Sequence, residues 1–425
     1  LKRVINTCHR YGIKVVPYFS LFELNAKSEA FADNHIYWRR TVDEKGLWIL
    51  ETYPPFYYGF VMCLSSSFKD FLKKYVKKVV KTLGFDGVYY DHADFWFCTN
   101  KIHKRGIHST IDDLIDFLEY TRELVGENGI ILLHQSGWFP CMLTENYADG
   151  HIMFEDNARW MEIPPLEEWP PNAMHIRFNI APKLPVPVKG VDRAEGLWNL
   201  CSKCSVLGAF PYSRLGPGSE AVLALFETFR AFDLSQFKFR DYTFGLVETS
   251  NESIRGAVYF DEDRAIVVLA NVTGNRGEKF RWKIKLERIG LKSSWKYHVT
   301  DSLGKHSCIL EGRVISKNGV EDSLDGYRFK AYYIVKHVKE RKRVLYNTRA
   351  WVEKHVDGKL IVETSGPEGQ EAVLKIYAPE KPQEIKLNSK ILEENEDWTW
   401  NEETKTATIV YRYYDTKAKV IIQVI

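Results

Sequence analysis

Residues 84–94, GFDGVYYDHAD, decide the fold of this chain. They predict a short buried strand that presents the carboxylate of Asp91 at its C-terminal end. The preceding residues 68–83 place apolar side chains at helical spacing with lysines between them, so they predict a helix that leads into this strand. In a parallel barrel the C-terminal ends of the strands face the active site, which makes Asp91 a catalytic candidate.

The order of helix followed by strand recurs along the first half of the chain. We expect strands at 13–19, 87–91, 130–134, 151–155, 175–180 and 206–212, and helices up to Arg10 and at 68–83, 111–125, 193–205 and 220–234. Such alternation favours parallel pairing. We therefore predict an α/β fold: a (β/α)8 TIM barrel over residues 1–236 that carries strands three to eight. An open doubly wound sheet is the alternative, although no Gly-x-Gly-x-x-Gly follows any expected strand.

The first residue, Leu1, lies inside an expected helix that leads straight into the third strand. We expect the chain to be a segment of a longer protein, with the first two barrel strands missing.

After residue 236 the apolar pattern changes to period two. Expected strands lie at 254–259, 264–272, 279–286, 295–300 and 328–335, and after a charged linker at 336–343 they continue at 358–364, 371–377, 384–387, 406–411 and 417–424. This alternation is typical of antiparallel sheets with one buried face. We predict a C-terminal β-sandwich at 237–338 and a second small β-domain at 339–425.

Composition excludes some classes of partner. A chain of 425 residues with 45% hydrophobic residues can fill more than one core. The net charge is only +3 and the basic residues are dispersed, so nucleic acid is not an expected partner. No apolar run approaches the ~20 residues that a membrane span requires, and we expect no membrane partner. The 14% aromatic content suits a carbohydrate-binding surface and interior packing equally well.

Metal and cofactor sites are not expected. The seven cysteines are scattered, and Cys201 and Cys204 lie in an expected helix without the second ligand pair that a zinc site needs. Helix packing is the favoured role for this pair. The oligomeric state is not indicated.

Two carboxylate clusters end expected strands: Asp91 with Asp94 on the fourth strand, and Glu155 with Asp156 on the sixth. Glycoside hydrolysis uses two carboxyl groups across one bond, about 5–5.5 Å apart in retaining enzymes and about 6.5–9.5 Å apart in inverting ones. Strands four and six of one barrel mouth can supply either spacing. Because adjacent strand residues point to opposite sides, only one of Glu155 and Asp156 faces the barrel centre.

Two other interpretations of these acids remain open. In the first, Asp91 caps the following segment and Glu155 forms a salt bridge with Arg159 or Arg177. In the second, Asp91, Asp94 and His92 surround a metal ion, which requires several convergent ligands.

Polar and aromatic residues after the same strands are candidate sugar contacts, although each also suits ordinary packing. They are Tyr18, Glu23, Asp94, Trp96, His134, Trp138, Arg177, Tyr212 and Arg214. The insertion at 21–64 is much longer than a usual loop of an α/β unit, so it forms either a binding wall or a subdomain packed on the rim.

Several of these segments resemble barrel glycoside hydrolases of the α-galactosidase and α-fucosidase type. The resemblance lies in CLSSSFKD at 63–70, FDGVYYD at 85–91, GIKVVPY at 12–18 and VVLANVT at 267–273, and it extends to about residue 335. It implies Asp91 as the nucleophile and Glu155 or Asp156 as the acid/base. The Lys-x-Asp usual on strand four of the α-galactosidase clan is replaced here by Tyr89-Tyr90-Asp91.

The expected function is hydrolysis of a glycosidic bond with retention, on a carbohydrate substrate. The alternative is a non-catalytic carbohydrate-binding protein built on a degenerate glycosidase barrel.

Overall fold

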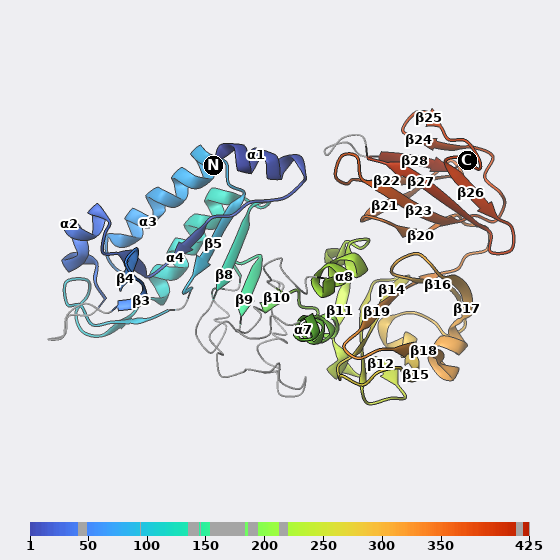
Figure 1. Ribbon diagram of the computed structural model, residues 1–425, viewed down its shortest axis with the longest axis horizontal. Helices are drawn as coiled ribbons and strands as arrows, with labels where there is room; N and C mark the ends of the chain where they lie inside the picture. The colour runs from blue at the N-terminus through green and yellow to red at the C-terminus, as the bar shows by residue number, and fades with distance from the viewer. Residues whose placement is uncertain are drawn as a thin grey trace. The chain divides into compact units, whose positions relative to one another are not determined.

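The computed structural model describes residues 1–40, 49–93, 95–134, 144, 146–153, 183–185, 194–211, 220–413 and 420–424 (Figure 1). It divides into two compact units. Unit 1 comprises Leu1–His9, Ile13–Ala158 and Pro170–Val186, and unit 2 comprises Arg10–Gly12, Arg159–Trp169 and Pro187–Ile425. The expected domain boundaries near 236 and 338 stay a prediction.

The centre of unit 1 is a five-stranded sheet in which every neighbouring pair is parallel. Its strands, in spatial order, are β1 (Tyr18–Ser20), β5 (Gly87–Asp91), β8 (Ile130–His134), β9 (Gly150–Met153) and β10 (Lys183–Pro185). The described helices are α1 (Lys2–Arg10), α2 (Glu29–Trp38), α3 (Phe68–Lys77) and α4 (Ile111–Val125), and α3 continues as a π-helical turn η1 (Lys78–Leu83). Figure 1 shows α3 and α4 beside this sheet.

The spatial order of these strands follows their order along the chain without a reversal. A doubly wound sheet reverses its order at a switch point, whereas a barrel adds each strand beside the preceding one. The described strands therefore have the order of a barrel segment, and no closed barrel forms among them. The strands expected at 87–91 and 130–134 are confirmed. The third strand is shorter than expected, and residues 175–180 lie outside the described part of the chain.

The strand expected at 206–212 is wrong over its described residues, 206–211. Helix α7 (Ala194–Leu207) includes its first two residues and ends at Gly208, whose φ is +67°. Val206 and Leu207 are buried on this helix. A short apolar run fits a buried helix and a buried strand equally, which explains the error.

The insertion at 21–64 is a packed subdomain of unit 1. Strands β2 (Glu23–Asn25), β3 (Ile49–Tyr53) and β4 (Tyr57–Val61) form an antiparallel sheet. Phe22, Trp38 and Met62 from this region join the main core of the unit beside Phe68 of α3. Burial of that many large apolar side chains fixes the insertion against the sheet.

Unit 2 contains the helices α7 and α8 (Glu220–Phe229), which pack on its first β-sheet through aromatic contacts such as Trp198 with Phe329 and Phe229 with Tyr259. That six-stranded antiparallel sheet contains β11 (Lys238–Arg240), β13 (Ile254–Phe260), β14 (Arg264–Asn271), β19 (Phe329–Lys336), β16 (Lys296–Asp301) and β17 (Ser307–Glu311). A three-stranded sheet of β12 (Val247–Thr249), β15 (Glu278–Ile284) and β18 (Val320–Leu324) completes the sandwich. The buried Trp282 and Tyr297 lie in the core of this sandwich, which confirms the expected change to antiparallel β structure.

A second β-sandwich follows within unit 2. One sheet contains β20 (Arg343–Asn347), β23 (Glu371–Tyr377), β27 (Thr406–Arg412) and β26 (Trp398–Asn401). The other contains β21 (Trp351–Val356), β22 (Lys359–Thr364), β28 (Val420–Val424), β24 (Ile385–Leu387) and β25 (Lys390–Ile391). Alternating side chains of the two sheets form a separate core, as the period-two pattern predicts. Among the described helices of the chain, none combines the length and the apolar character that crossing a membrane requires.

Candidate active site

Asp91 is the last residue of β5, and side chains from both neighbouring strands contact its carboxylate. Tyr18 of β1 donates a hydrogen bond of 2.7 Å from its hydroxyl to Oδ2. Nδ1 of His134, at the end of β8, lies 2.8 Å from Oδ1, and the backbone N–H of His92 donates to the same oxygen. The parallel register brings these strand ends together, because Ser20 pairs with Asp91 and the residue before His134 pairs with Tyr90. The expected convergence of Tyr18, Asp91 and His134 at one sheet edge is therefore observed.

The surroundings of Asp91 favour its ionised form. Burial by itself would raise the pKa of this carboxyl, which is only 8% exposed. The hydrogen bond from His134, the charges of His92 and His134, and the hydrogen bond from Tyr18 outweigh burial and lower the pKa to about 2. Asp91 is thus a carboxylate at neutral pH, the state that a nucleophile needs and that a general acid cannot use.

His92 connects Asp91 to a second buried carboxylate, that of Glu23 in β2. Its Nδ1 lies 4.0 Å from Asp91 Oδ2, 3.7 Å from Glu23 Oε2 and 3.2 Å from the hydroxyl of Ser20. The backbone of His92 has a φ of +53°, a conformation that costs energy in residues other than glycine and that clusters at functional sites. The Glu23 side chain is only 1% exposed, and its expected role as a sugar contact stays a prediction.

Gly59 makes room for the buried Glu23 carboxylate. A Cβ at position 59 would meet Glu23 Oε1 and the ring of Tyr57 at less than van der Waals distance. The hydroxyl of Tyr57 lies 3.4 Å from Glu23 Oε2. The rim subdomain thus supplies both the carboxylate and the space that it occupies.

The side chain of Trp96 lies on the segment after β5 and is half-buried. The guanidinium of Arg40 lies 4.4 Å from its ring centroid, and the ring of Phe22 contacts its edge. Its backbone N–H donates to the hydroxyl of Thr110. These contacts fix the loop, and the expected role of Trp96 in sugar binding stays a prediction.

The remaining candidate residues lie outside the described part of the chain. They are Asp94, Trp138, Glu155, Asp156, Arg177, Tyr212 and Arg214. Strand β9 ends at Met153, immediately before the segment that carries the expected acid/base.

Two residues of the Asp91 cluster were not among the expected sugar contacts. Tyr89 has its hydroxyl 3.0 Å from Nδ1 of His134, and its ring contacts that of Tyr18 edge to face. The period of two in a strand places Tyr89 on the same side as Asp91, and this signal was available in the sequence. Ser20 was not recognisable, because its contact with His92 depends on the positive φ of that residue.

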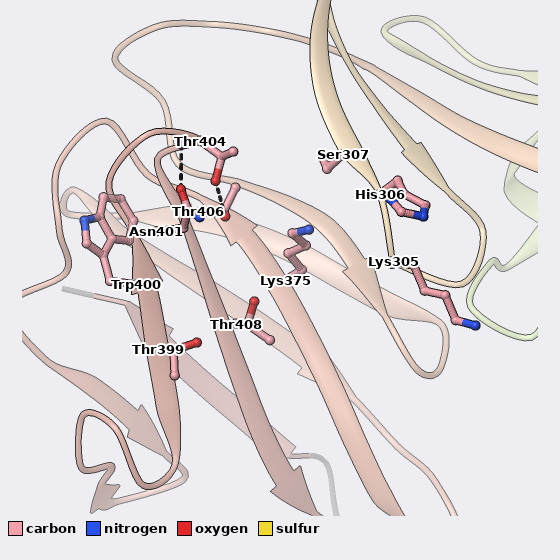
Figure 2. A pocket seen from close by; sticks show the side chains of 10 residues that line it. All are labelled: Lys305, His306, Ser307, Lys375, Thr399, Trp400, Asn401, Thr404, Thr406 and Thr408. Carbon is pink, nitrogen blue, oxygen red and sulfur yellow. Dashed lines mark hydrogen bonds between the residues drawn. The ribbon is translucent and has the colours of Figure 1, made fainter. Parts of the chain in front are cut away.

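Unit 2 contains a polar cavity of about 460 Å³ between its two sandwiches (Figure 2). Its lining residues are Lys305, His306, Ser307, Lys375, Thr399, Trp400, Asn401, Thr404, Thr406 and Thr408. Figure 2 shows the turn at 305–307 opposite the strands that bear the threonines. The described lining includes no carboxylate, so this cavity has groups for binding but not for two-carboxylate hydrolysis.

A metal at Asp91 finds no support in the described residues. The one group of His, Cys, Asp and Glu side chains that the described chain gathers closely enough for a metal ion is Cys63, Cys98 and His108. The interpretation of Asp91, Asp94 and His92 as metal ligands stays open, because Asp94 lies outside the described residues.

Comparisons with known proteins identify the fold. No family model matches the sequence, and no curated protein matches it. Among solved structures, the chain is similar to a noncanonic maltogenic α-amylase from Thermotoga neapolitana, with a TM-score of 0.53 and 11% identity over 79% of this chain and 81% of that one. An α-amylase from Geobacillus thermoleovorans gives a TM-score of 0.51 with 10% identity over 79% and 80%. The galactosidase domain of an α-galactosidase-sucrose kinase gives 0.52 with 12% identity over 79% and 46%.

These likenesses show that the chain has the fold of the glycoside hydrolases with β-domains after the α/β part. Amylases and a galactosidase domain match about equally well, so the fold does not single out the α-galactosidase and α-fucosidase type. Sequence identities of 10–12% show a shared fold, and they do not show a shared substrate or mechanism.

Proposed function

We propose that this chain is a retaining glycoside hydrolase with Asp91 as its nucleophile. The observation that supports this most is an ionised carboxylate at the C-terminal edge of a parallel sheet, where Tyr18 and His134 hold both of its oxygens. In folds of this kind catalytic groups come from that edge. The low pKa of Asp91 suits attack on an anomeric carbon rather than proton donation.

In the proposed reaction, an oxygen of Asp91 attacks the anomeric carbon while a carboxylic acid protonates the leaving oxygen, and a glycosyl ester forms. The acid is Glu155 or Asp156, which follow shortly after the end of β9 at Met153. The same group then takes a proton from water, which attacks the anomeric carbon and releases Asp91. Tyr18 and His134 hold the two carboxylate oxygens in place and keep Asp91 ionised before it attacks.

Tyr18 has a further role in this scheme. Its side chain is 53% exposed although its hydroxyl is bonded to Asp91, so it reaches from the carboxylate toward the sugar. As charge leaves Asp91 when the ester forms, this hydrogen bond weakens, and it regains strength when the ester is hydrolysed. Tyr18 thereby stabilises Asp91 as the leaving group of the second step.

The substrate class is the less specific part of the proposal. Solved structures of similar fold are named as α-amylases and as a galactosidase, so α-glucosides and α-galactosides are the first substrates to test. The sequence Tyr89-Tyr90-Asp91 stands where the α-galactosidase clan has Lys-x-Asp, and this departure argues against a galactose-type specificity.

The experiment is hydrolysis of a panel of aryl α- and β-glycosides by the wild-type chain and by Asp91→Asn. We expect the wild type to cleave at least one aryl glycoside, and Asp91→Asn to lose turnover by at least a thousandfold while it remains folded by circular dichroism. Asp112→Asn, an exposed acid of α4 in the same unit, is the matched control and should retain full activity. Equal turnover by Asp91→Asn and the wild type would refute the assignment of Asp91.

A second candidate function is carbohydrate binding without hydrolysis, favoured by the cavity of unit 2. Trp400 is partly buried there and lies near Asn401 and the threonines of β26, of β27 and of the turn between them, a combination of ring and hydroxyl groups that suits sugars. This function predicts saturable binding of an oligosaccharide that Trp400→Ala weakens and Asp91→Asn leaves unchanged. Hydrolysis of the same oligosaccharide into shorter products would instead support the glycoside hydrolase function.

A further inference from the structure

Cys98 and His108, on the segment that follows β5, and Cys63, which precedes that strand, form a cluster of sulfur and imidazole groups that the proposed hydrolysis does not use. Sγ of Cys63, Sγ of Cys98 and a ring nitrogen of His108 all lie within 4.8 Å of one another. Both cysteines are buried, and His108 is partly buried. A tetrahedral zinc ion with sulfur ligands at about 2.3 Å holds such ligands about 3.8 Å apart, so a small adjustment suffices.

The backbone brings these three residues together. Cys98 belongs to β6 (Phe97–Cys98) and His108 to β7 (His108–Ser109), and the two residues are direct partners across this antiparallel pair. Side chains of directly paired residues project to the same side of a ladder. Cys63 follows β4, where its N–H bonds to the carbonyl of Trp38, and it comes from a separate part of the chain.

His108 offers a nitrogen to the cluster. Its Nδ1 lies 3.3 Å from the carbonyl oxygen of Gly106, which can only accept, so Nδ1 carries the hydrogen and Nε2 carries the lone pair. That Nε2 atom is buried and has no hydrogen-bond partner among the described residues. Metal-binding histidines usually donate their other ring N–H to a carbonyl in this way.

His103 shows the same arrangement beside Cys98. Its Nε2 lies 2.6 Å from the carbonyl oxygen of Tyr37, so Nε2 carries the hydrogen. Its Nδ1 therefore has the lone pair, and it lies 3.2 Å from Sγ of Cys98. His103 contacts Cys98 but is not one of the three groups that lie within 4.8 Å of one another, so its ring has to move toward the other two to become a fourth ligand.

The sulfur of Cys98 has two further polar neighbours. Its thiol donates to the carbonyl oxygen of Arg40 at 3.1 Å, and Nδ1 of His103 lies 3.2 Å from the same sulfur. A thiol loses its proton when it binds a metal, so uptake of a metal ion by Cys63 and Cys98 releases protons.

We propose that Cys63, Cys98 and His108 bind a zinc ion, with His103 as the fourth ligand. Two thiolates and two imidazoles without an open position form a structural site. The ion ties β6 and β7 to the end of β4, so it anchors the segment that carries Trp96 and begins directly after the Asp91 cluster. Its role is to hold this segment in place, and the claim does not depend on the chemistry of Asp91.

The test is the metal content of the full chain, expressed with added Zn²⁺ and purified without chelators or a histidine tag. Elemental mass spectrometry should find about one zinc per chain in the wild type. The control Cys308→Ser, which changes an exposed cysteine of unit 2, should contain the same amount. Cys63→Ser and Cys98→Ser should lose the zinc, and His103→Ala should bind it at least tenfold more weakly.

A second measurement covers the case in which the cysteine variants fail to fold. Co²⁺ added to the metal-free wild-type chain should give the visible absorption of a tetrahedral site with two thiolates. Chelator should lower the melting temperature of the zinc-loaded wild type. A wild-type chain that contains no zinc and takes up neither Zn²⁺ nor Co²⁺ would overturn the proposal, as would a disulfide between Cys63 and Cys98 in the freshly purified protein.

Discussion

The hydroxyl of Tyr18 donates a hydrogen bond of 2.7 Å to Oδ2 of Asp91 across the pair of parallel strands β1 and β5. The two residues are 73 positions apart in the sequence. Because Tyr18 is exposed and Asp91 is buried, the bond connects the carboxylate of the sheet edge with the surface of unit 1.

Tyr18→Phe removes this bond and leaves the ring in place. A hydrogen bond to a charged group contributes about 1.5–3 kcal/mol, so we expect kcat/KM to fall roughly ten- to a hundredfold. The pKa of Asp91 should rise, which moves the acidic limb of the pH–rate profile upward. Tyr75→Phe, another partly exposed tyrosine of unit 1, is the control. A profile and a rate identical to the wild type in Tyr18→Phe would show that the bond has no part in catalysis.

His134 should tolerate one replacement and not another. The amide nitrogen of Asn can take the place of Nδ1, so His134→Asn keeps a donor to Asp91 Oδ1, while His134→Leu removes it. We expect His134→Leu to lose more activity than His134→Asn by about tenfold or more, because the hydrogen bond is to a charged group. Steady-state kinetics with the best aryl glycoside measure this difference. Equal losses in both variants would mean that His134 acts through packing alone.

Asp91 should also make the stability of the protein depend on pH. Its pKa is lowered to about 2 in the folded chain, so the ionised form stabilises the fold above the unfolded pKa near 4, and this contribution disappears as the pH falls through about 2. The contribution is about 2 kcal/mol at neutral pH. Asp91→Asn should therefore melt below the wild type at pH 7, and the two melting temperatures should converge near pH 2. A constant difference across this range would contradict the lowered pKa.

Gly87 at the start of β5 should not accept a side chain. A Cβ there would lie 1.8 Å from the carbonyl oxygen of Ile130 on β8, a backbone atom that cannot move without breaking the sheet. Overpacking of this kind costs about 1–3 kcal/mol or more, so Gly87→Ala should lower the melting temperature clearly. Gly274→Ala, whose Cβ would have its nearest neighbour at 3.4 Å, should melt like the wild type. A wild-type melting curve for Gly87→Ala would argue against the close pairing of β5 with β8.

Much of this fold could be predicted from local patterns. The helix at Ile111–Val125 and the strands at Gly87–Asp91 and Ile130–His134 have the expected bounds, because apolar periodicity and Gly punctuation agree there. Residues 206–211 were assigned to the wrong element because their apolar run fits both a helix and a strand.

The candidate site was predictable only in part. The end of the strand identified Asp91, and the neighbouring strand ends identified Tyr18 and His134. The link through His92 to Glu23 was not predictable, because it depends on a positive φ and on the packing of the rim subdomain. The group of Cys63, Cys98 and His108 was not predictable, because the spacing of its members along the chain follows no common zinc motif. The pairing of β6 with β7 joins Cys98 to His108, and the packing of the rim subdomain adds Cys63.

The most direct test of the central claim is covalent labelling of Asp91. Wild-type chain is incubated with an activated, fluorinated analogue of the sugar that it hydrolyses fastest, since the fluorine slows breakdown of the glycosyl ester. Peptide mass spectrometry should then find the sugar on the peptide that contains Asp91, at one label per chain, and Asp112→Asn should label equally. A label on another carboxylate, or continued turnover of the ordinary substrate with no label at all, would contradict the assignment of Asp91 as the nucleophile of a retaining glycosidase.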